Sequence, residues 1–591
     1  MNMKIRFLRF LPIKFLLIFA LVSCSVTSKK NFRIFETTDV HGVILPYDFI
    51  EKQKLNFSMA STYNYIKQAR TGNNGTMLLD NGDNLQGQPE VYYYNFIDTI
   101  SPHFLAEVMN YMGYEAGTVG NHDVEAGHAV YDRLIKEYKF PLLAANAVDV
   151  KTGEPYFKPY QIIKKDGIRI AVLGLVTPAI PNWLPPKLYS GIEFKDMVET
   201  ARKWMPVILN EKPDLVVGLF HSGWDRNEGK AQHTGNLSEN GSAAVAFNVP
   251  GFDIIFTGHD HKVANEKFVN SAGDTILILN GGSRSEKLAE ADIAISSKKI
   301  KGKKQMKITG HLINVADFKP DPDFIAKFDP QYKVIDEYVN RVIGTSSATI
   351  SSREAYFGSS AFIDMIHSIQ LEITGADISF AAPLSFDVQI NKGPVTVGDM
   401  FKLYRFENML YTMSLSGEEI QKYLEFSYSG WLNTMMGPAD HLLKFRTGQN
   451  GKPVITNEKA WLKNQSYNFD SAAGINYTVD VSKPEGTRVT IQGFTDGRAF
   501  EKNKMYRVAV NSYRGNGGGG HFTEGAGIPK DELRKRLISS TDRDLRYYIL
   551  KSIEAKRTIS PLPLNNWKII PEKWVNSVRS SEYDLLFGHN K

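Results

Sequence analysis

The sequence predicts an α/β protein with two domains. The chain has 591 residues, and a single hydrophobic core stops growing at roughly 250–300 residues. Short apolar runs end in clusters of Gly, Asn, Asp and His, and helical patterns lie between these runs. Buried strands followed by polar loops are typical of layered α/β domains, in which functional sites lie at the ends of strands.

Residues 1–23 are predicted to be a signal peptide, because a basic start precedes an apolar run, residues 15–22, that is too short to cross a bilayer. The segment ends Leu-Val-Ser-Cys24, which resembles the lipobox of bacterial lipoproteins, whose cysteine becomes the lipidated first residue. The alternative is an ordinary signal peptide in which Cys24, the only cysteine of the chain, has no such role. We therefore expect an exported lipoprotein, periplasmic or at the cell surface.

The charge of the chain gives no indication of a polyanionic partner. The formal net charge of +6 includes four basic side chains of the signal peptide, so the mature chain carries +2. That is too little to predict binding to nucleic-acid polymers or to a membrane surface. We expect a monomer that contacts the membrane only through its lipid.

Five apolar runs in the first part of the chain predict buried strands, and the segment from Phe104 to Met112 predicts a helix. The runs are Phe32–Phe35, Thr76–Leu79, Ile168–Leu175, Leu215–Phe220 and Ile254–Thr257. The first domain is expected at residues 24–318.

The first domain is predicted to end where two prolines within residues 319–323 suit a linker. An amphipathic helix from about Phe324 to Val342 follows and is expected to bridge two domains. Linker and helix together occupy residues 319–345.

A second α/β domain is expected at residues 346–565, and it opens with a helical segment from Ser360 to Thr374. Residues 566–591 form a tail. The tryptophans in that tail, Trp567 and Trp574, predict that it packs on the body of the protein.

Five polar clusters follow these strands or a helix–turn segment. They are Asp39-Val40-His41, Gly82-Asp83, Gly120-Asn121-His122-Asp123, His221-Ser222-Gly223 and Gly258-His259-Asp260-His261. Their imidazole, carboxylate and amide groups suit divalent Zn, Mn or Co. One Asp-x-His alone is commonplace, whereas five such clusters in order are not expected by chance.

The order and type of the clusters resemble the calcineurin-like metallophosphoesterase pattern DxH, GD, GNH[DE], H and GHxH. Within that superfamily the chain resembles the bacterial 5′-nucleotidase family over nearly all of its mature length. The resemblance implies a four-layer β-sandwich flanked by helices, followed by a second α/β domain that binds nucleotides.

The resemblance also implies two divalent metal ions. Asp39, His41 and His261 would bind one ion, Asn121, His221 and His259 the other, and Asp83 would bridge them. Such a pair of ions polarises phosphoryl oxygens and activates water for attack on phosphorus.

His122 is implied to act on the substrate rather than to bind metal. In the family this residue lies over the phosphate and stabilises charge in the transition state. Many relatives have an acidic residue three positions later, and here it is Glu125, where 5′-nucleotidases usually have Asp. The longer side chain leaves the orientation of His122 open.

Two segments of the second domain are implied to bind the substrate. Phe406-Glu407-Asn408 resembles the family's F-x-N segment, in which Asn408 is the substrate-binding residue. The segment from Asn511 to Gly518 resembles one that carries a base-stacking aromatic, Tyr513, and Phe469 would be the second aromatic. The alternative for Phe469 is packing in the core.

The branch of the family, and with it the expected substrate, is inferred from a departure from the family pattern. The 5′-nucleotidase branch has an Asn-Gly-Gly-Gly-Ile-Arg stretch whose arginine helps bind substrate, whereas residues 381–386 here read Ala-Ala-Pro-Leu-Ser-Phe. This variant resembles the 2′,3′-cyclic-nucleotide 2′-phosphodiesterase/3′-nucleotidase branch. We therefore expect hydrolysis of 2′,3′-cyclic nucleotides and 3′-nucleotides to nucleosides and phosphate.

Two other functions stay open. The first is a 5′-nucleotidase or nucleotide-sugar hydrolase, against which the missing arginine stretch argues. The second is a surface lipoprotein that binds nucleotides without turnover, against which the complete set of ligands argues, since a binding protein would be free to lose one.

Overall fold

The computed structural model describes residues 29–72, 75–227, 238–300 and 303–588. The predicted signal peptide and Cys24 lie outside these residues. None of the helices formed by the described residues has the length and apolar character needed to cross a bilayer.

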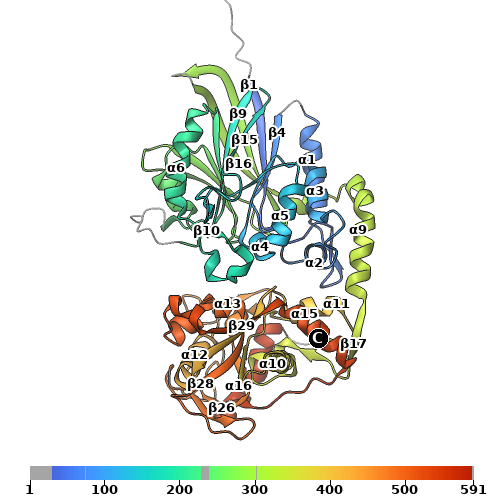
Figure 1. The fold of residues 1–591 in the computed structure, drawn as a ribbon, viewed down its shortest axis with the longest axis vertical. Helices are drawn as coiled ribbons and strands as arrows, with labels where there is room; N and C mark the ends of the chain where they lie inside the picture. The colour runs from blue at the N-terminus through green and yellow to red at the C-terminus, as the bar shows by residue number, and fades with distance from the viewer. Residues whose placement is uncertain (1–28, 73–74, 228–237, 301–302, 589–591) are drawn as a thin grey trace, which may run out of the picture.

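The first domain consists of two six-stranded sheets that pack face to face, with helices on both outer faces (Figure 1). The first sheet has the order β16 (Lys303–Asn314), β15 (Lys287–Ile300), β1 (Lys29–Thr37), β4 (Gly75–Asp80), β5 (Ala116–Thr118) and β6 (Leu142–Leu143). The second has the order β13 (Ala264–Val269), β14 (Thr275–Asn280), β12 (Ile254–Thr257), β11 (Leu215–His221), β9 (Ile168–Val176) and β8 (Tyr160–Lys165).

The helices complete the four layers. The first sheet is covered by α1 (Met59–Arg70), α2 (Pro89–Phe96), α3 (Phe104–Met112), α5 (His128–Glu137) and α9 (Pro322–Asn340), and the second by α6 (Met197–Asn210) and α8 (Ser242–Asn248). Along β1 the side chains alternate, so that Ile34 packs between the sheets and Phe35 packs against helices. The predicted four-layer fold is confirmed, and the predicted strands and the helix from Phe104 to Met112 are present.

Helix α9 connects the domains. Its N-terminus includes part of the proline-rich segment that was predicted to be a linker. Asp321 Oδ1 accepts a hydrogen bond from the backbone N–H of Phe324 at 2.9 Å, and Pro322 occupies the first helical turn. Proline is favoured there because its missing N–H would have no partner in the helix. The segment predicted as a linker therefore caps a helix.

The second domain is built on a five-stranded sheet with helices on both faces. Its order is β25 (Ser471–Ala473), β19 (Ile378–Ala381), β28 (Met505–Asn511), β22 (Met409–Ser416) and β29 (Leu537–Asp544). One face packs against α10 (Ala361–Thr374) and α15 (Leu545–Lys556), with α11 (Val397–Leu403) packed on α15, and the other packs against α12 (Gly417–Trp431). Helix α16 (Glu572–Phe587) belongs to the same hydrophobic core as α12.

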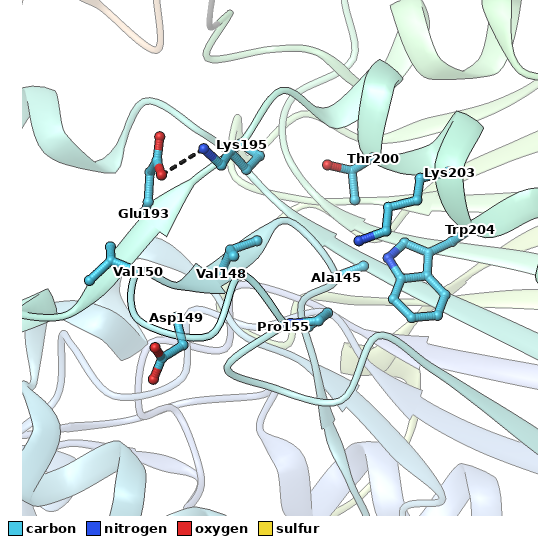
Figure 2. Close-up of a pocket in the computed structure, with 11 residues that line it drawn as sticks. Ala145, Val148, Asp149, Val150, Pro155, Glu193, Lys195, Thr200, Lys203 and Trp204 are labelled. Carbon is cyan, nitrogen blue, oxygen red and sulfur yellow. Dashed lines mark ion pairs between the residues drawn. The ribbon is translucent and has the colours of Figure 1, made fainter.

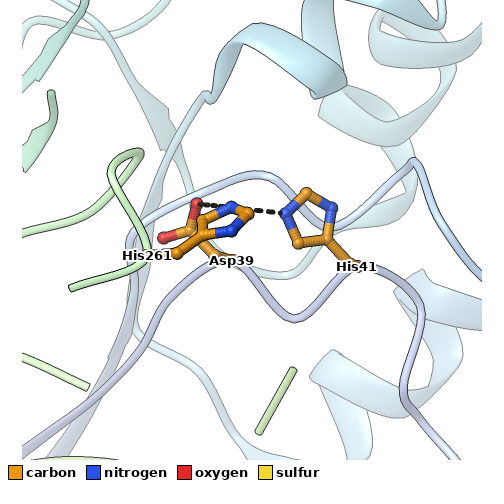
Figure 3. A group of neighbouring side chains, drawn as sticks. All are labelled: Asp39, His41 and His261. Carbon is orange, nitrogen blue, oxygen red and sulfur yellow. Dashed lines mark hydrogen bonds and ion pairs between the residues drawn. The ribbon is translucent and has the colours of Figure 1, made fainter. Parts of the chain in front are cut away.

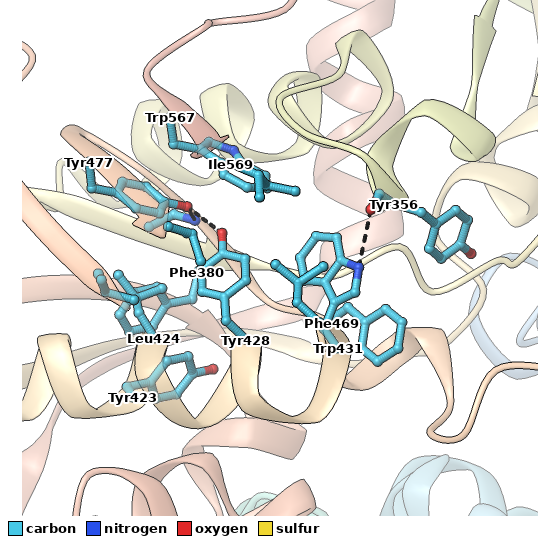
Figure 4. Packing of buried hydrophobic residues seen from close by; sticks show 14 of the residues in the cluster. Tyr356, Phe380, Tyr423, Leu424, Tyr428, Trp431, Phe469, Tyr477, Trp567 and Ile569 are labelled. Atoms are coloured by element: carbon cyan, nitrogen blue, oxygen red, sulfur yellow. Dashed lines mark hydrogen bonds between the residues drawn. The ribbon is translucent and has the colours of Figure 1, made fainter. Parts of the chain in front are cut away.

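The C-terminal tail packs into the second domain. Strand β31 (Trp567–Ile570) pairs with β26 (Ile475–Asp480), and the Trp567 ring stacks on Tyr477 with centroids 5.6 Å apart (Figure 4). Trp574 packs against the same core from α16.

The two domains meet at the edge of the sandwich where the parallel strands end (Figure 1). Tyr92 Oη donates to Asp544 Oδ2 at 3.0 Å, and Asn516 Nδ2 donates to the Trp183 carbonyl at 3.1 Å. Any site at this edge is therefore shared between the domains.

His367 predicts a pH dependence of stability. It is buried in the second domain, with Nδ1 2.9 Å from Ser379 Oγ and Nε2 3.1 Å from Ser471 Oγ, and burial lowers its pKa from 6.5 to about 3. Below pH 6.5 the unfolded state binds a proton that the folded state does not, so the unfolding free energy falls as pH falls. Between about pH 7.5 and 5.0, wild type should lose about 2 kcal/mol more than His367→Gln in urea unfolding. Equal losses would show that the residue is not held neutral.

Candidate active site

The structure brings all seven predicted metal ligands to the shared edge, because parallel strands deliver their loops to the same side. Asp39 and His41 follow β1, Asp83 follows β4, Asn121 begins α4 (Asn121–Glu125) after β5, His221 ends β11, and His259 and His261 follow β12. They form two groups.

The first group consists of Asp39, His41 and His261, whose ligand atoms all lie within 4.8 Å of one another (Figure 3). His41 Nε2 is 3.0 Å from His261 Nε2, and His261 Nε2 is 3.4 Å from Asp39 Oδ1. Burial, together with the nearby His122, lowers the pKa of His41 to about 4, so this imidazole is neutral at pH 7. A neutral imidazole and a carboxylate that converge in this way suit a shared cation.

The second group consists of Asp83, His221 and His259, and Asn121 joins it. His221 Nε2 lies 3.0 Å from Asp83 Oδ2 and 3.2 Å from Asn121 Oδ1. His259 Nδ1 lies 2.7 Å from the same amide oxygen. Four side chains from four loops therefore offer donor atoms to one point.

Three of the histidines are held in the orientation that a metal needs. Their outward nitrogens face oxygen acceptors: His41 Nδ1 is 3.0 Å from the Gln86 carbonyl, His221 Nδ1 is 2.6 Å from the Asn81 carbonyl, and His259 Nε2 is 2.9 Å from Glu239 Oε1. A carbonyl or carboxylate only accepts, so each outward nitrogen donates, and the inward nitrogen is the one that can bind a metal once it carries no proton. The donor set thus fits two divalent ions. Glu239 was not predicted, because it belongs to no motif.

The backbone is strained where the ligands converge. Five of the seven predicted ligands have positive φ: Asp39 (49°), His41 (50°), Asp83 (56°), His259 (75°) and His261 (57°). Such conformations cost about 1–3 kcal/mol each and are typical of functional sites. Gly120 is needed for the same convergence, because a Cβ there would lie 2.1 Å from Asp83 Oδ1.

His122 is oriented by Glu125, with His122 Nδ1 2.5 Å from Glu125 Oε2. The longer acidic side chain therefore still reaches the imidazole. Burial alone would lower the pKa of His122, but the carboxylates of Asp83 and Glu125 outweigh burial and raise it to about 9. The catalytic role of both residues stays a prediction.

The prediction that Phe469 stacks on a base is corrected by the structure. Its side chain is 1% exposed, and its ring stacks on Trp431 with centroids 5.1 Å apart and planes at 5° (Figure 4). The ring is already covered by the core of the second domain, so it offers no face to a ligand.

A different aromatic residue, Phe406, is available instead. Phe406 and Tyr513 are both half-buried, and Tyr467 lies near them, with its ring centroid 6.3 Å from that of Phe406. Burial raises the pKa of Tyr513, and the carboxylate of Glu239 in the first domain adds to this effect, so Tyr513 lies on the side of the metal ligands. The signal for Phe406 was present in the sequence, because it belongs to the Phe-x-Asn segment.

Asn408 is placed in the same segment but is mostly buried. Asn408 is 8% exposed, and its backbone carbonyl accepts a hydrogen bond from the backbone N–H of Leu545 at 2.8 Å. A direct contact with substrate stays a prediction.

The known proteins to which this chain is similar agree with the geometry of the site. Residues 32–263 match the family model for calcineurin-like phosphoesterases, and residues 342–524 match that for the 5′-nucleotidase C-terminal domain. The 2′,3′-cyclic-nucleotide 2′-phosphodiesterase/3′-nucleotidase of Salmonella typhimurium is 28% identical over 94% of this chain and 91% of its own.

Two further proteins are similar over most of the chain. The trifunctional nucleotide phosphoesterase YfkN of Bacillus subtilis is 26% identical over 93% of this chain, which spans 40% of that protein. The crystal structure of a candidate 5′-nucleotidase from Staphylococcus aureus covers 91% of this chain and 100% of its own, with a TM-score of 0.72 at 21% identity. At that identity the likeness extends to the fold alone.

Asp83→Asn should be the most damaging change of a single ligand. The predicted bridging carboxylate would be replaced by a neutral amide, which leaves two dications close together without a shared negative charge. Elemental analysis should find both metals lost, whereas the control His221→Ala should lose one. Retention of both metals in Asp83→Asn with near-normal turnover would contradict the bridging role.

His122→Ala should keep both metals and lower kcat for a small aryl phosphodiester by about 10²–10³-fold, the usual effect of losing one transition-state stabiliser. Metal content and kcat are measured on the same preparation. Loss of metal in this variant would instead make His122 a ligand.

Proposed function

The chain belongs to the 5′-nucleotidase family of calcineurin-like phosphoesterases, and on that basis we propose that it hydrolyses 2′,3′-cyclic nucleotides and 3′-nucleotides to nucleosides and phosphate. The observation that carries the proposal is the position of the two ligand groups at the domain junction, opposite half-buried aromatic rings of the second domain. Zn²⁺, Mn²⁺ and Co²⁺ all suit the donor set.

The first domain would supply the reaction chemistry. Asp39, His41 and His261 would hold one ion and Asn121, His221 and His259 the other, with Asp83 between them. When bound, the two ions would polarise the phosphoryl oxygens and activate water. Glu125 occupies Nδ1 of His122, so Nε2 is the atom that can donate a hydrogen bond to a phosphoryl oxygen.

The second domain would supply substrate recognition. The rings of Phe406 and Tyr513 would stack on the base, which contributes roughly 1–3 kcal/mol per base without strong discrimination between bases. Binding energy of this kind acts far from the reacting phosphorus, so it would appear mainly in KM.

The assignment to the 2′,3′-cyclic-nucleotide branch is supported by residues 381–386 and by the similar proteins described above. Ala381 and Ala382 are each 3% exposed in the core, at the position where the 5′-nucleotidase branch has its glycine and arginine stretch. The Salmonella relative that carries the cyclic phosphodiesterase name matches nearly the whole chain. Export and lipidation at Cys24 belong to the same proposal and rest on the lipobox-like sequence.

The branch is tested with a substrate panel on purified, metal-loaded protein. 2′,3′-cyclic AMP and 3′-AMP should have a higher kcat/KM than 5′-AMP. A preference of about tenfold or more for 5′-AMP or a nucleotide sugar would overturn the branch and leave the two-metal site intact. Absence of turnover by protein that holds both metals would instead favour a binding lipoprotein.

The same panel, run on Phe406→Ala and Tyr513→Ala, tests the aromatic pair. Each change should raise KM for nucleotides by about ten- to a hundredfold, given the energy of stacking. Hydrolysis of bis(p-nitrophenyl) phosphate should be unchanged, because that substrate carries no base. The matched control is Trp461→Ala, which removes a 53% exposed ring elsewhere in the domain.

A further inference from the structure

A segment of the first domain, residues 177–191, lies between the predicted metal ligands and the second domain. It follows β9 at the edge where the parallel strands end, and it contains the short helices η1 (Ile180–Asn182) and η2 (Pro186–Tyr189). Its start is tied to one of the ligands, because the backbone N–H of Thr177 donates to the carbonyl of His221 at 2.8 Å. No motif marks this segment in the sequence.

Both domains hold the segment in place. On the side of the first domain, Ile180 is buried in the hydrophobic core. On the side of the second domain, Arg534 Nη2 donates to Tyr189 Oη at 3.1 Å, and Lys187 Nζ donates to the carbonyl of Thr541 at 2.6 Å. The position of the segment is therefore fixed relative to both domains.

Trp183 is the residue of this segment that packs on a predicted metal ligand. Its indole stacks on the imidazole of His259, with ring centroids 5.4 Å apart and planes at 30°. Its backbone carbonyl accepts a hydrogen bond from Asn516 Nδ2 at 3.1 Å. Asn516 lies three residues after Tyr513. The indole therefore lies beside a ligand group and is anchored to the segment that carries Tyr513.

The imidazole of His259 is held without the indole. Its Nε2 is 2.9 Å from Glu239 Oε1, and its Nδ1 is 2.7 Å from Asn121 Oδ1, so both ring nitrogens have a partner. Trp183 is also half-buried, whereas Ile180, three positions earlier, is fully buried. A large aromatic ring that is partly exposed beside a ligand group, and that does not fix the geometry of that group, is available to a substrate.

We propose that Trp183 is a substrate-contact residue that packs against the group bonded to the departing oxygen, which in a nucleotide is the ribose. The inference rests on the proposed function, because it takes the phosphorus to lie at the two ligand groups. The organic part of the substrate would then extend from His259 toward Phe406 and Tyr513. Trp183 contacts His259 through its ring and the segment of Tyr513 through its carbonyl, so the group next to the phosphorus would meet its indole.

The chemistry of an indole suits that group. Its face packs against the C–H groups of a sugar or the flat face of an aryl ring, and its N–H can donate one hydrogen bond. Phe406 and Tyr513 would affect only substrates that carry a base. Trp183 would affect nucleotides and small aryl phosphodiesters alike, because each has a group bonded to the phosphate oxygen. Inorganic phosphate has no such group and would not be affected.

The proposal is tested with Trp183→Ala and Trp183→Phe in purified, metal-loaded protein. Trp183→Ala should keep both metals and raise KM for both 2′,3′-cyclic AMP and bis(p-nitrophenyl) phosphate by about tenfold, with kcat changed by less than about threefold. The inhibition constant of inorganic phosphate should be unchanged. Trp183→Phe keeps a ring face, so its KM values should lie within about threefold of those of wild type.

The matched control is Trp204→Ala, which removes another half-buried tryptophan of the first domain. Trp204 lies on α6 beside a hollow that also borders β7 (Ala147–Asp149) and β10 (Ile192–Phe194) (Figure 2). None of the predicted metal ligands lines that hollow. The control should therefore leave both KM values unchanged.

Three results would overturn the proposal. Unchanged KM values in Trp183→Ala would show that the ring does not touch the substrate. Loss of a metal, or weaker inhibition by phosphate, would show that the ring supports His259 instead. A rise in KM for the nucleotide alone would place the ring at the base. Because the comparison on bis(p-nitrophenyl) phosphate needs no nucleotide recognition, an incorrect assignment of the nucleotide substrate would not change its result.

Discussion

The site depends on one constraint: one ring nitrogen of each of His41, His221 and His259 must face the point where the side chains converge. Each of these nitrogens is turned inward because the opposite nitrogen donates to a fixed oxygen. Those oxygens belong to two backbone carbonyls and to Glu239, so the positions of three loops are set by the same hydrogen bonds. The positive φ angles at five of the predicted ligands are the conformational cost of this convergence, and the sandwich core must offset that cost.

The domain junction follows from the same edge. Because parallel strands deliver all ligand loops to one side, whatever recognises the rest of the substrate must approach from outside that side. In the proposed function the second domain would do so with Phe406, whose neighbours Tyr404 and Arg405 are hydrogen-bonded to Arg546, and with Tyr513, two residues after β28. Reaction chemistry and recognition would then be separate in the chain and adjacent in space, and buried Arg546 contacts rings of both domains, Tyr92 and Phe401.

Predictions made from local sequence patterns were correct, whereas the prediction for Phe469, which depended on long-range packing, was wrong. The strand runs and the helix from Phe104 to Met112 were predictable because periodicity and turn residues act over a few positions. Phe469 was assigned wrongly, because its burial is decided by Trp431, which lies on a helix distant in sequence. Glu239 could not be found, since an acidic residue outside any motif gives no signal until a fold places it beside His259.

The sequence by itself determined the family, the two-domain α/β architecture and the residue types that can bind metal, since these are properties of short segments in order. Tertiary structure alone decided which nitrogen of each histidine faces inward, that Glu125 reaches His122, and that Phe406 rather than Phe469 has an accessible ring. It also placed the indole of Trp183 against His259. The physical reason is common to all four. Hydrogen-bond partners, burial and ring contacts arise between segments far apart in the chain, and no local pattern records which segments will meet.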